Sequence, residues 1–141
     1  MAHRKPGFVI DRIRNIIVVE TYGIWDIPTD YEYLSALAET MNLMRGNPWY
    51  VFVDMREWVV PDAISQSPFK SDVVLTRSNQ MSECWLVAEP AQGEHIAPFF
   101  EKARVPLIRT TTVEGVDEWL TKHSLPVTAE LLLGSLYIAK H

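Results

Sequence analysis

The segment of residues 48–58 constrains the fold more than any other part of the chain. Its centre, residues 50–54, is a short apolar run with aromatic and β-branched side chains, which is typical of a buried strand. Charged residues follow in the stretch 55–61, as they do when a strand surfaces and becomes a loop. In open α/β sheets, binding sites form at the carboxyl ends of such strands. We therefore expect a central strand with a site near its C-terminal end.

Composition narrows the class of protein. The chain has 141 residues, of which 48% are hydrophobic and 22% are charged. This length and balance predict one globular domain rather than a disordered chain. The net charge of −5 argues against nucleic-acid binding, which needs a basic surface. The basic residues near the N-terminus, Arg4, Lys5, Arg12 and Arg14, are interpreted as the solvated side of a hairpin.

The cellular compartment is predicted from the cysteine content and the N-terminus. Cys84 is the single cysteine, so an internal disulfide is excluded and a reducing cytoplasm is favoured. Residues 1–6 lack the apolar core of a signal peptide. No apolar stretch approaches the roughly 18 residues of a membrane-spanning helix. We expect a cytoplasmic protein without a transmembrane segment.

Local patterns predict the elements of the first half. Residues 8–10 and 16–19 are rich in β-branched side chains, which predicts two antiparallel strands. Thr29 and Glu32 then form a capping box, which predicts the start of a helix. Its apolar stripe recurs at helical spacing, and Gly46 is expected to end it.

Strands and helices alternate in the second half. Strands are expected at residues 84–88 and 106–109. Helices are expected at 67–79, 95–104 and 128–140. A further helix is expected to begin at a second capping box, which Thr111 and Glu114 form. This alternation predicts an α/β fold: a five-stranded mixed sheet with helices mainly on one face, plus a C-terminal helix. One domain spans residues 1–141, with a core at 7–123 and a helical extension at 126–141.

The final predicted helix is apolar on more than one side, with Leu131, Leu132, Leu133, Leu136, Tyr137 and Ile138. Such a helix needs burial on several sides. We therefore expect it either to pack across the open face of the sheet or to mediate a homodimer.

Several segments together resemble the SpoIIAA-like fold of STAS domains, which is related to the Sec14-like (CRAL-TRIO) lipid-binding proteins. The resemblance covers residues 7–123, and its segments are similar to those of many bacterial STAS/Sec14-type proteins. It rests on the segments 23–26 (Gly-Ile-Trp-Asp), 47–49 (Asn-Pro-Trp), 53–58, 106–109 and 116–120. It implies a regulatory domain that binds proteins or apolar ligands.

The family also implies a serine that is phosphorylated after an aspartate. In this chain Asp62 stands at the place of that aspartate, but Ala63 follows it and has no hydroxyl. Ser65 and Ser67 lie nearby but out of register. The usual phosphoacceptor serine of the family is therefore lacking.

Polar residues of the same region are the first candidates for chemistry. Asp54, Arg56, Glu57 and Asp62 cluster around one predicted loop, where paired carboxylates could act as acid and base. The alternative is a solvated strand end with a local ion pair. The four histidines have no metal spacing, and no phosphate-binding glycine loop occurs. We therefore expect no metal and no cofactor.

Aromatic residues are the second set of candidates. Trp25, Trp49 and Trp58 either line a pocket or partner surface, or close the ends of the core. Phe99 and Phe100 likewise either line a lipid-sized cavity or pack in the core.

Our first functional hypothesis is a non-enzymatic binding or regulatory domain that contacts a protein or a small apolar ligand. The candidate contact residues are Trp25, Asp54, Arg56, Trp58, Asp62, Ser65 and Ser67. One alternative is a small hydrolase or isomerase that uses Asp54, Glu57 or Asp62. The other alternative is a lipid carrier of the Sec14 type, which requires an enclosed apolar cavity.

Overall fold

The computed structural model describes residues 5–62, 75 and 77–140. Within that part of the chain, five strands and four helices follow one another. Their bounds are β1 (Gly7–Ile13), β2 (Ile16–Ile24), α1 (Ile27–Asn42), β3 (Trp49–Val59), β4 (Gln80–Leu86), α3 (Ala97–Ala103), β5 (Leu107–Thr110), α4 (Val113–Lys122) and α5 (Ala129–Lys140). The helix expected at 67–79 lies mostly outside the described residues, and the described residues 75 and 77–79 are not helical.

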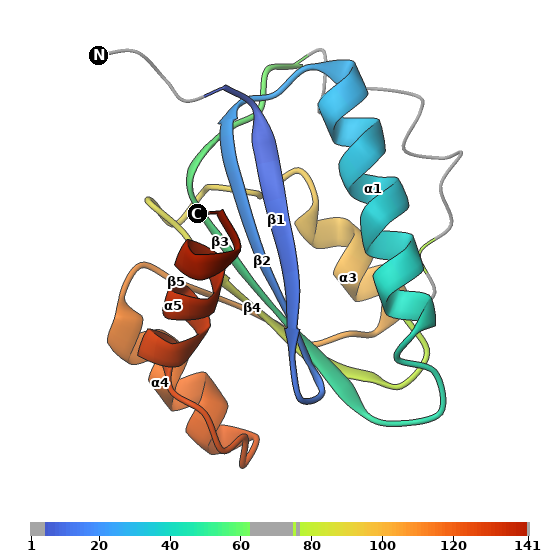
Figure 1. The fold of residues 1–141 in the computed structure, drawn as a ribbon, viewed down its shortest axis with the longest axis vertical. Helices are drawn as coiled ribbons and strands as arrows, with labels where there is room; N and C mark the ends of the chain where they lie inside the picture. The colour runs from blue at the N-terminus through green and yellow to red at the C-terminus, as the bar shows by residue number, and fades with distance from the viewer. Residues whose placement is uncertain (1–4, 63–74, 76, 141) are drawn as a thin grey trace.

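The strands form one sheet in the order β1-β2-β3-β4-β5 (Figure 1). β1 pairs with β2 in antiparallel fashion, and the remaining pairs are parallel. The prediction of a five-stranded mixed α/β sheet is therefore confirmed.

Helices cover both faces of this sheet. β2 and β3 carry consecutive apolar residues, so side chains of both faces require burial. Ile17 and Val51 belong to a cluster with residues of α1 and α3, whereas Ile16 and Phe52 belong to a second cluster with residues of α4 and α5. Figure 1 shows these two pairs of helices on opposite sides of the sheet. The expectation of helices mainly on one face is wrong, because the apolar runs leave neither face polar.

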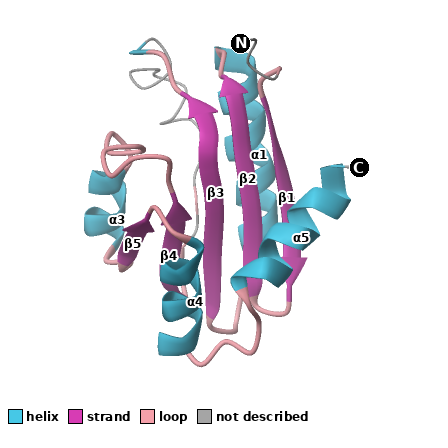
Figure 2. Cartoon of the chain, turned by 90° about the vertical axis from the view of Figure 1, so that its left-hand side faces the viewer, coloured by secondary structure: helices cyan, strands magenta, loops and turns pink. Residues whose placement is uncertain are grey.

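The C-terminal helix α5 lies across β1 and β2 (Figure 2). Its own residues Ala129, Leu132 and Leu136 are buried. The prediction that this helix packs across the open face is therefore confirmed. Tyr137 and Ile138 remain exposed on its outer side, and a homodimer through α5 stays a prediction.

Two helices begin at residues other than those expected. Asp26, not Thr29, caps α1: its carboxylate accepts hydrogen bonds from the backbone N–H and the hydroxyl of Thr29, at 2.8 Å and 2.5 Å. Thr112, not Thr111, caps α4 and accepts the N–H of Gly115 at 3.0 Å. In both cases a neighbouring residue with an equally suitable side chain takes the capping position.

The end of α1 also differs from the expectation. The helix ends at Asn42, and Gly46 lies in the following turn with a φ of +88°. Gly46 thus adopts the left-handed conformation that glycine favours, but four residues beyond the last helical residue.

β3 is longer than expected. Its last residues occupy the stretch 55–59, where the charged composition predicted a loop. Within it the register with β2 shifts, since Glu20 pairs with Asp54 but Tyr22 pairs with Glu57. β3 therefore contains one extra residue, as in a β-bulge. The shift brings Met55 and Trp58, which are three residues apart, into the same apolar cluster.

Among the described residues, every helix is too short or too polar to span a lipid bilayer.

Candidate functional site

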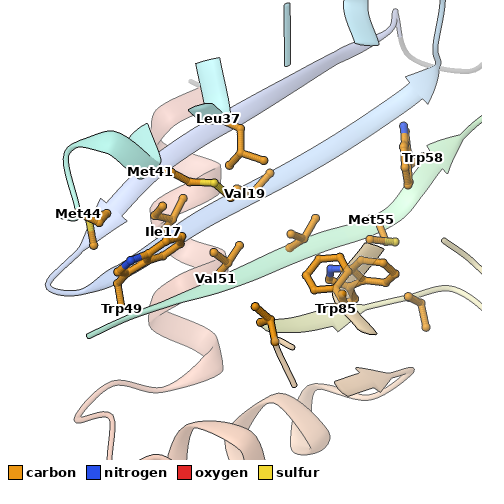
Figure 3. Packing of buried hydrophobic residues seen from close by; sticks show 14 of the residues in the cluster. Ile17, Val19, Leu37, Met41, Met44, Trp49, Val51, Met55, Trp58 and Trp85 are labelled. Carbon is orange, nitrogen blue, oxygen red and sulfur yellow. The ribbon is translucent and has the colours of Figure 1, made fainter. Parts of the chain in front are cut away.

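A cavity of about 590 Å³ lies between α1, α3 and the adjacent face of β2, β3 and β4. Leu37 of α1 and Phe100 of α3 contribute to its walls. Met55 and Trp85 contribute from the sheet, and Figure 3 shows them on the same face as Leu37. A volume of this size is typical of sites for small organic molecules.

Aromatic rings form one end of this cavity. The ring of Trp25 lies 5.3 Å from that of Trp58 and 5.2 Å from that of Tyr33, in edge-to-face arrangements. The indole N–H of Trp25 donates to the carbonyl oxygens of Tyr22 and Gly7, at 3.0 Å and 3.2 Å. The backbone of β1 and β2 thus fixes the ring of Trp25, and the ring of Trp58 packs against it.

Two residues that line the cavity each have a buried polar atom without a hydrogen-bond partner among the described residues. These atoms are the indole nitrogen of Trp58 and the hydroxyl oxygen of Thr21. The two residues are 7% and 2% exposed. Leaving a buried polar group without a partner costs about 1–3 kcal/mol. Because both atoms are closed to solvent, they are a cost to the fold and not contact points for a ligand.

A buried ion pair forms another part of the wall. Glu83 is 4% exposed and accepts hydrogen bonds from Arg77 at 3.2 Å, from Gln80 at 2.9 Å and from the Trp85 indole at 2.6 Å. The guanidinium of Arg77 also lies 4.4 Å from the centre of the Phe100 ring. The Glu83 carboxylate is therefore held in place by three donors.

Tyr33 lies in the cavity wall near both carboxylates and a guanidinium. Burial raises the pKa of the Tyr33 hydroxyl, and the charges of Glu83 and Asp30 raise it further, whereas Arg77 opposes them. Asp30 is itself buried in the first turn of α1 and lines the cavity. The lining therefore holds two carboxylates, Asp30 and Glu83, and two cations, Arg77 and Lys102.

Gln92 fixes the end of β3 that carries Trp58. Its side-chain nitrogen donates to the carbonyl oxygens of Met55 and Trp58, at 2.5 Å and 3.0 Å. Its side-chain oxygen accepts the N–H of Ala88, just after β4, at 2.7 Å. The register-shifted part of β3 is thereby tied to the segment between β4 and α3.

Asp54 and Arg56 belong to a different site. Side chains alternate along β3, so Asp54 shares the face of Phe52, which packs with α4 and α5. Its carboxylate binds the Arg56 guanidinium. Its paired residue in β2, Glu20, binds Lys140 of α5 at 2.7 Å. The sheet thus separates Asp54 from the cavity, and of the predicted site residues that the structure describes, Trp25 and Trp58 line it.

Two further predicted residues, Asp62 and Glu57, lie outside this cavity wall. Both are exposed. Ser65 and Ser67, with Ala63, lie outside the described residues.

The aromatic predictions have separate outcomes. Trp49 is buried at the opposite end of β3 and donates to the carbonyl oxygen of Ser78 at 2.8 Å. Phe100 is both a core residue and part of the cavity wall, whereas Phe99 lines the cavity while 57% exposed.

The sequence interpretation missed several residues of the site, namely Thr21, Tyr33, Arg77, Glu83 and Gln92. One signal was available, since Glu83 stands directly before the apolar run at 84–87, where a charge inside a strand needs a partner. Arg77 gave no such signal, because its partner could be identified only from the folded structure.

Comparison with protein-family models, with curated proteins and with solved structures found no match. In the part of the chain that the structure describes, no group of three or more His, Cys, Asp or Glu side chains is placed to hold a metal ion. The site is therefore interpreted from its own geometry.

Proposed function

We propose that this chain is a non-enzymatic binding domain that holds a small, mainly apolar molecule between α1 and α3. The cavity of about 590 Å³ carries this proposal, because its wall combines packed aromatic rings with a few polar side chains such as Arg77 and Glu83. Ligand sites commonly combine a largely apolar wall with a few fixed polar groups. The resemblance to STAS and Sec14-like domains supports the same class of function.

The placement of the carboxylates supports binding rather than turnover. Asp54 faces away from the cavity and is engaged by Arg56. Glu83 faces the cavity, but it already accepts three hydrogen bonds. An acid–base catalyst needs a carboxyl group that reaches the substrate with a usable proton site. The Sec14-type carrier belongs to the same class of proposal, with a lipid as the ligand.

The first experiment fills the cavity. Leu37 is 4% exposed and lines it, whereas Leu43, just after α1, is 68% exposed. Leu37→Trp places a larger side chain in the cavity, and Leu43→Trp is a matched control with the same added ring. Binding is measured by fluorescence titration with N-phenyl-1-naphthylamine, a neutral apolar probe.

We expect saturable binding of one probe molecule to the wild type and to Leu43→Trp. Leu37→Trp is expected to weaken binding at least tenfold, with far-ultraviolet circular dichroism checking that it folds. Leu37→Phe, a smaller enlargement, serves if the tryptophan variant does not fold. Equal affinity of Leu37→Trp and the wild type, or binding without saturation, would contradict the proposal.

A further inference from the structure

The residues that line the cavity differ in exposure, and this difference shows where the cavity opens. The exposed residues of the lining are Ser78, Phe99, Lys102 and Ala103, and three of them belong to α3. Phe99 lies three residues before Lys102 and four before Ala103, so these side chains share one face of the helix. Trp25, at the other end of the lining, is buried. Among the described residues, the mouth of the cavity therefore lies along this face of α3.

Four charged side chains line the cavity, and their surroundings differ. Glu83 is 4% exposed and forms an ion pair with Arg77 at 3.2 Å. Asp30 is buried in the first turn of α1, where the N-terminal end of a helix favours a negative charge. Lys102 is exposed, and no carboxylate of the described residues forms an ion pair with it. The unbalanced charge at the mouth is therefore positive.

The carboxylate of Asp30 and the ammonium of Lys102 belong to different ends of the cavity. Asp30 lies in the first turn of α1, whereas Lys102 lies in the last turn of α3. Figure 1 shows α1 and α3 running in roughly the same direction, with α1 beginning near the edge where β2 and β3 end. An anionic group beside Lys102 is thereby kept away from Asp30.

Head groups of different charge meet this mouth differently. An ammonium is repelled by Lys102 and competes with Arg77 for Glu83. A hydroxyl gains no more than a neutral hydrogen bond. A single negative charge balances the unpaired ammonium of Lys102, and at the exposed mouth it keeps contact with water, so the cost of burying a charge is avoided.

Building on the proposed binding function, we infer that the cavity binds an apolar molecule that ends in a single negative charge, as a fatty acid does. The anionic group lies at the mouth beside Lys102. The apolar part contacts the rings and aliphatic side chains between α1 and α3.

The test uses three probes of equal chain length that displace N-phenyl-1-naphthylamine: decanoate, decanol and decylammonium. Titrations at neutral pH and low ionic strength keep the screening of exposed charges small. An apolar cavity without the ammonium favours decanol, which has no charge to desolvate. We expect decanoate to bind the wild type about fivefold more tightly than decanol, the upper range for an exposed ion pair, and decylammonium to bind most weakly.

Variants of Lys102 assign this preference to one side chain. Lys102→Met keeps the length of the side chain and removes its charge, and it is expected to abolish the preference for decanoate while decanol affinity changes less than twofold. Lys102→Glu is expected to reverse the order, so that decylammonium binds more tightly than decanoate. Lys122 is exposed in the last turn of α4, and Lys122→Met and Lys122→Glu are controls with the same changes of net charge.

The outcomes separate this inference from the proposed function. If the neutral fluorescent probe binds and Leu37→Trp blocks it, the binding function stands. Decanol or decylammonium binding at least as tightly as decanoate then overturns the inference alone, as does failure of all three probes to displace the dye. A preference that survives in Lys102→Met, or that Lys122→Met lowers equally, also overturns it. Absence of dye binding overturns the proposed function as well.

Discussion

The carboxylate of Asp54 accepts two hydrogen bonds of 2.9 Å from the guanidinium of Arg56, and a third of 3.2 Å from the Arg56 backbone N–H. These bonds lie where β3 gains one residue relative to β2. A bulge leaves backbone groups without their usual partners. The Asp54 side chain supplies an acceptor at this point and so stabilises the bulged part of β3 that leads to Trp58.

This relationship predicts unequal effects of removing its two partners. Asp54→Ala is expected to lower the free energy of unfolding by about 1–3 kcal/mol, because a partly buried backbone N–H and a guanidinium lose their acceptor. Arg56→Ala is expected to cost less than about 1 kcal/mol, because the Arg56 side chain is 43% exposed and its charge is screened. Urea unfolding of each variant gives both values. An equal cost would mean that the ion pair, rather than the backbone contact, is the important interaction.

The strands themselves were predictable from sequence for a simple physical reason. Residues 16–19 and 84–87 are short, continuous apolar runs, and such runs are typical of strands buried on both sides. The same observation predicts helices on both faces, but we expected them mainly on one. The predicted alternation of elements does not determine where α4 and α5 pack, since they follow the last strand of the sheet.

The candidate site was predictable only in part. Trp25 and Trp58 stand out as large aromatic residues near a strand end, and both line the cavity. Asp54 and Arg56 stand beside Trp58 in sequence but face the other side of the sheet. The extra residue in β3 changes which side chains share a face, and no period-2 pattern reveals such a shift.

A second prediction concerns the turn between β4 and α3, where Gly93 has a φ of +79°. A Cβ atom at this position would lie 2.7 Å from the Trp85 ring and 3.2 Å from the Met55 sulfur. Gly46 has a similar φ of +88°, but a Cβ atom there would have no neighbour within 4 Å. Comparing an alanine substitution at Gly93 with one at Gly46 therefore separates the cost of backbone strain from the cost of side-chain crowding.

We expect Gly46→Ala to lower the free energy of unfolding by about 1–2 kcal/mol through the left-handed backbone alone. Gly93→Ala is expected to cost about 1–3 kcal/mol more, because the added methyl group overpacks the core. Urea unfolding compares the two variants. Equal losses would show that the ring of Trp85 moves aside without cost.

The third prediction concerns stability at alkaline pH and involves Cys84. This thiol is buried in β4, and burial, with the charge of Glu83, raises its pKa from an ordinary value of 9.0 to about 12. The folded protein therefore holds the thiol proton more tightly than the unfolded chain does. The resulting stability is fully present below pH 9, and it is lost as the pH rises from 9 towards 12.

Urea unfolding at pH 8 and pH 10, for the wild type and Cys84→Ala, measures this contribution. The wild type is expected to lose about 1.4 kcal/mol more than the variant between the two pH values, which corresponds to one proton over one pH unit beyond the unfolded pKa. Every other ionisable group is the same in the two proteins, so its effect cancels in the difference. The cavity left by the shorter alanine side chain lowers the stability of the variant at both pH values and likewise cancels. Parallel losses in the two proteins would mean that the thiol ionises as readily in the folded protein as in the unfolded chain, and that β4 does not shield it from water.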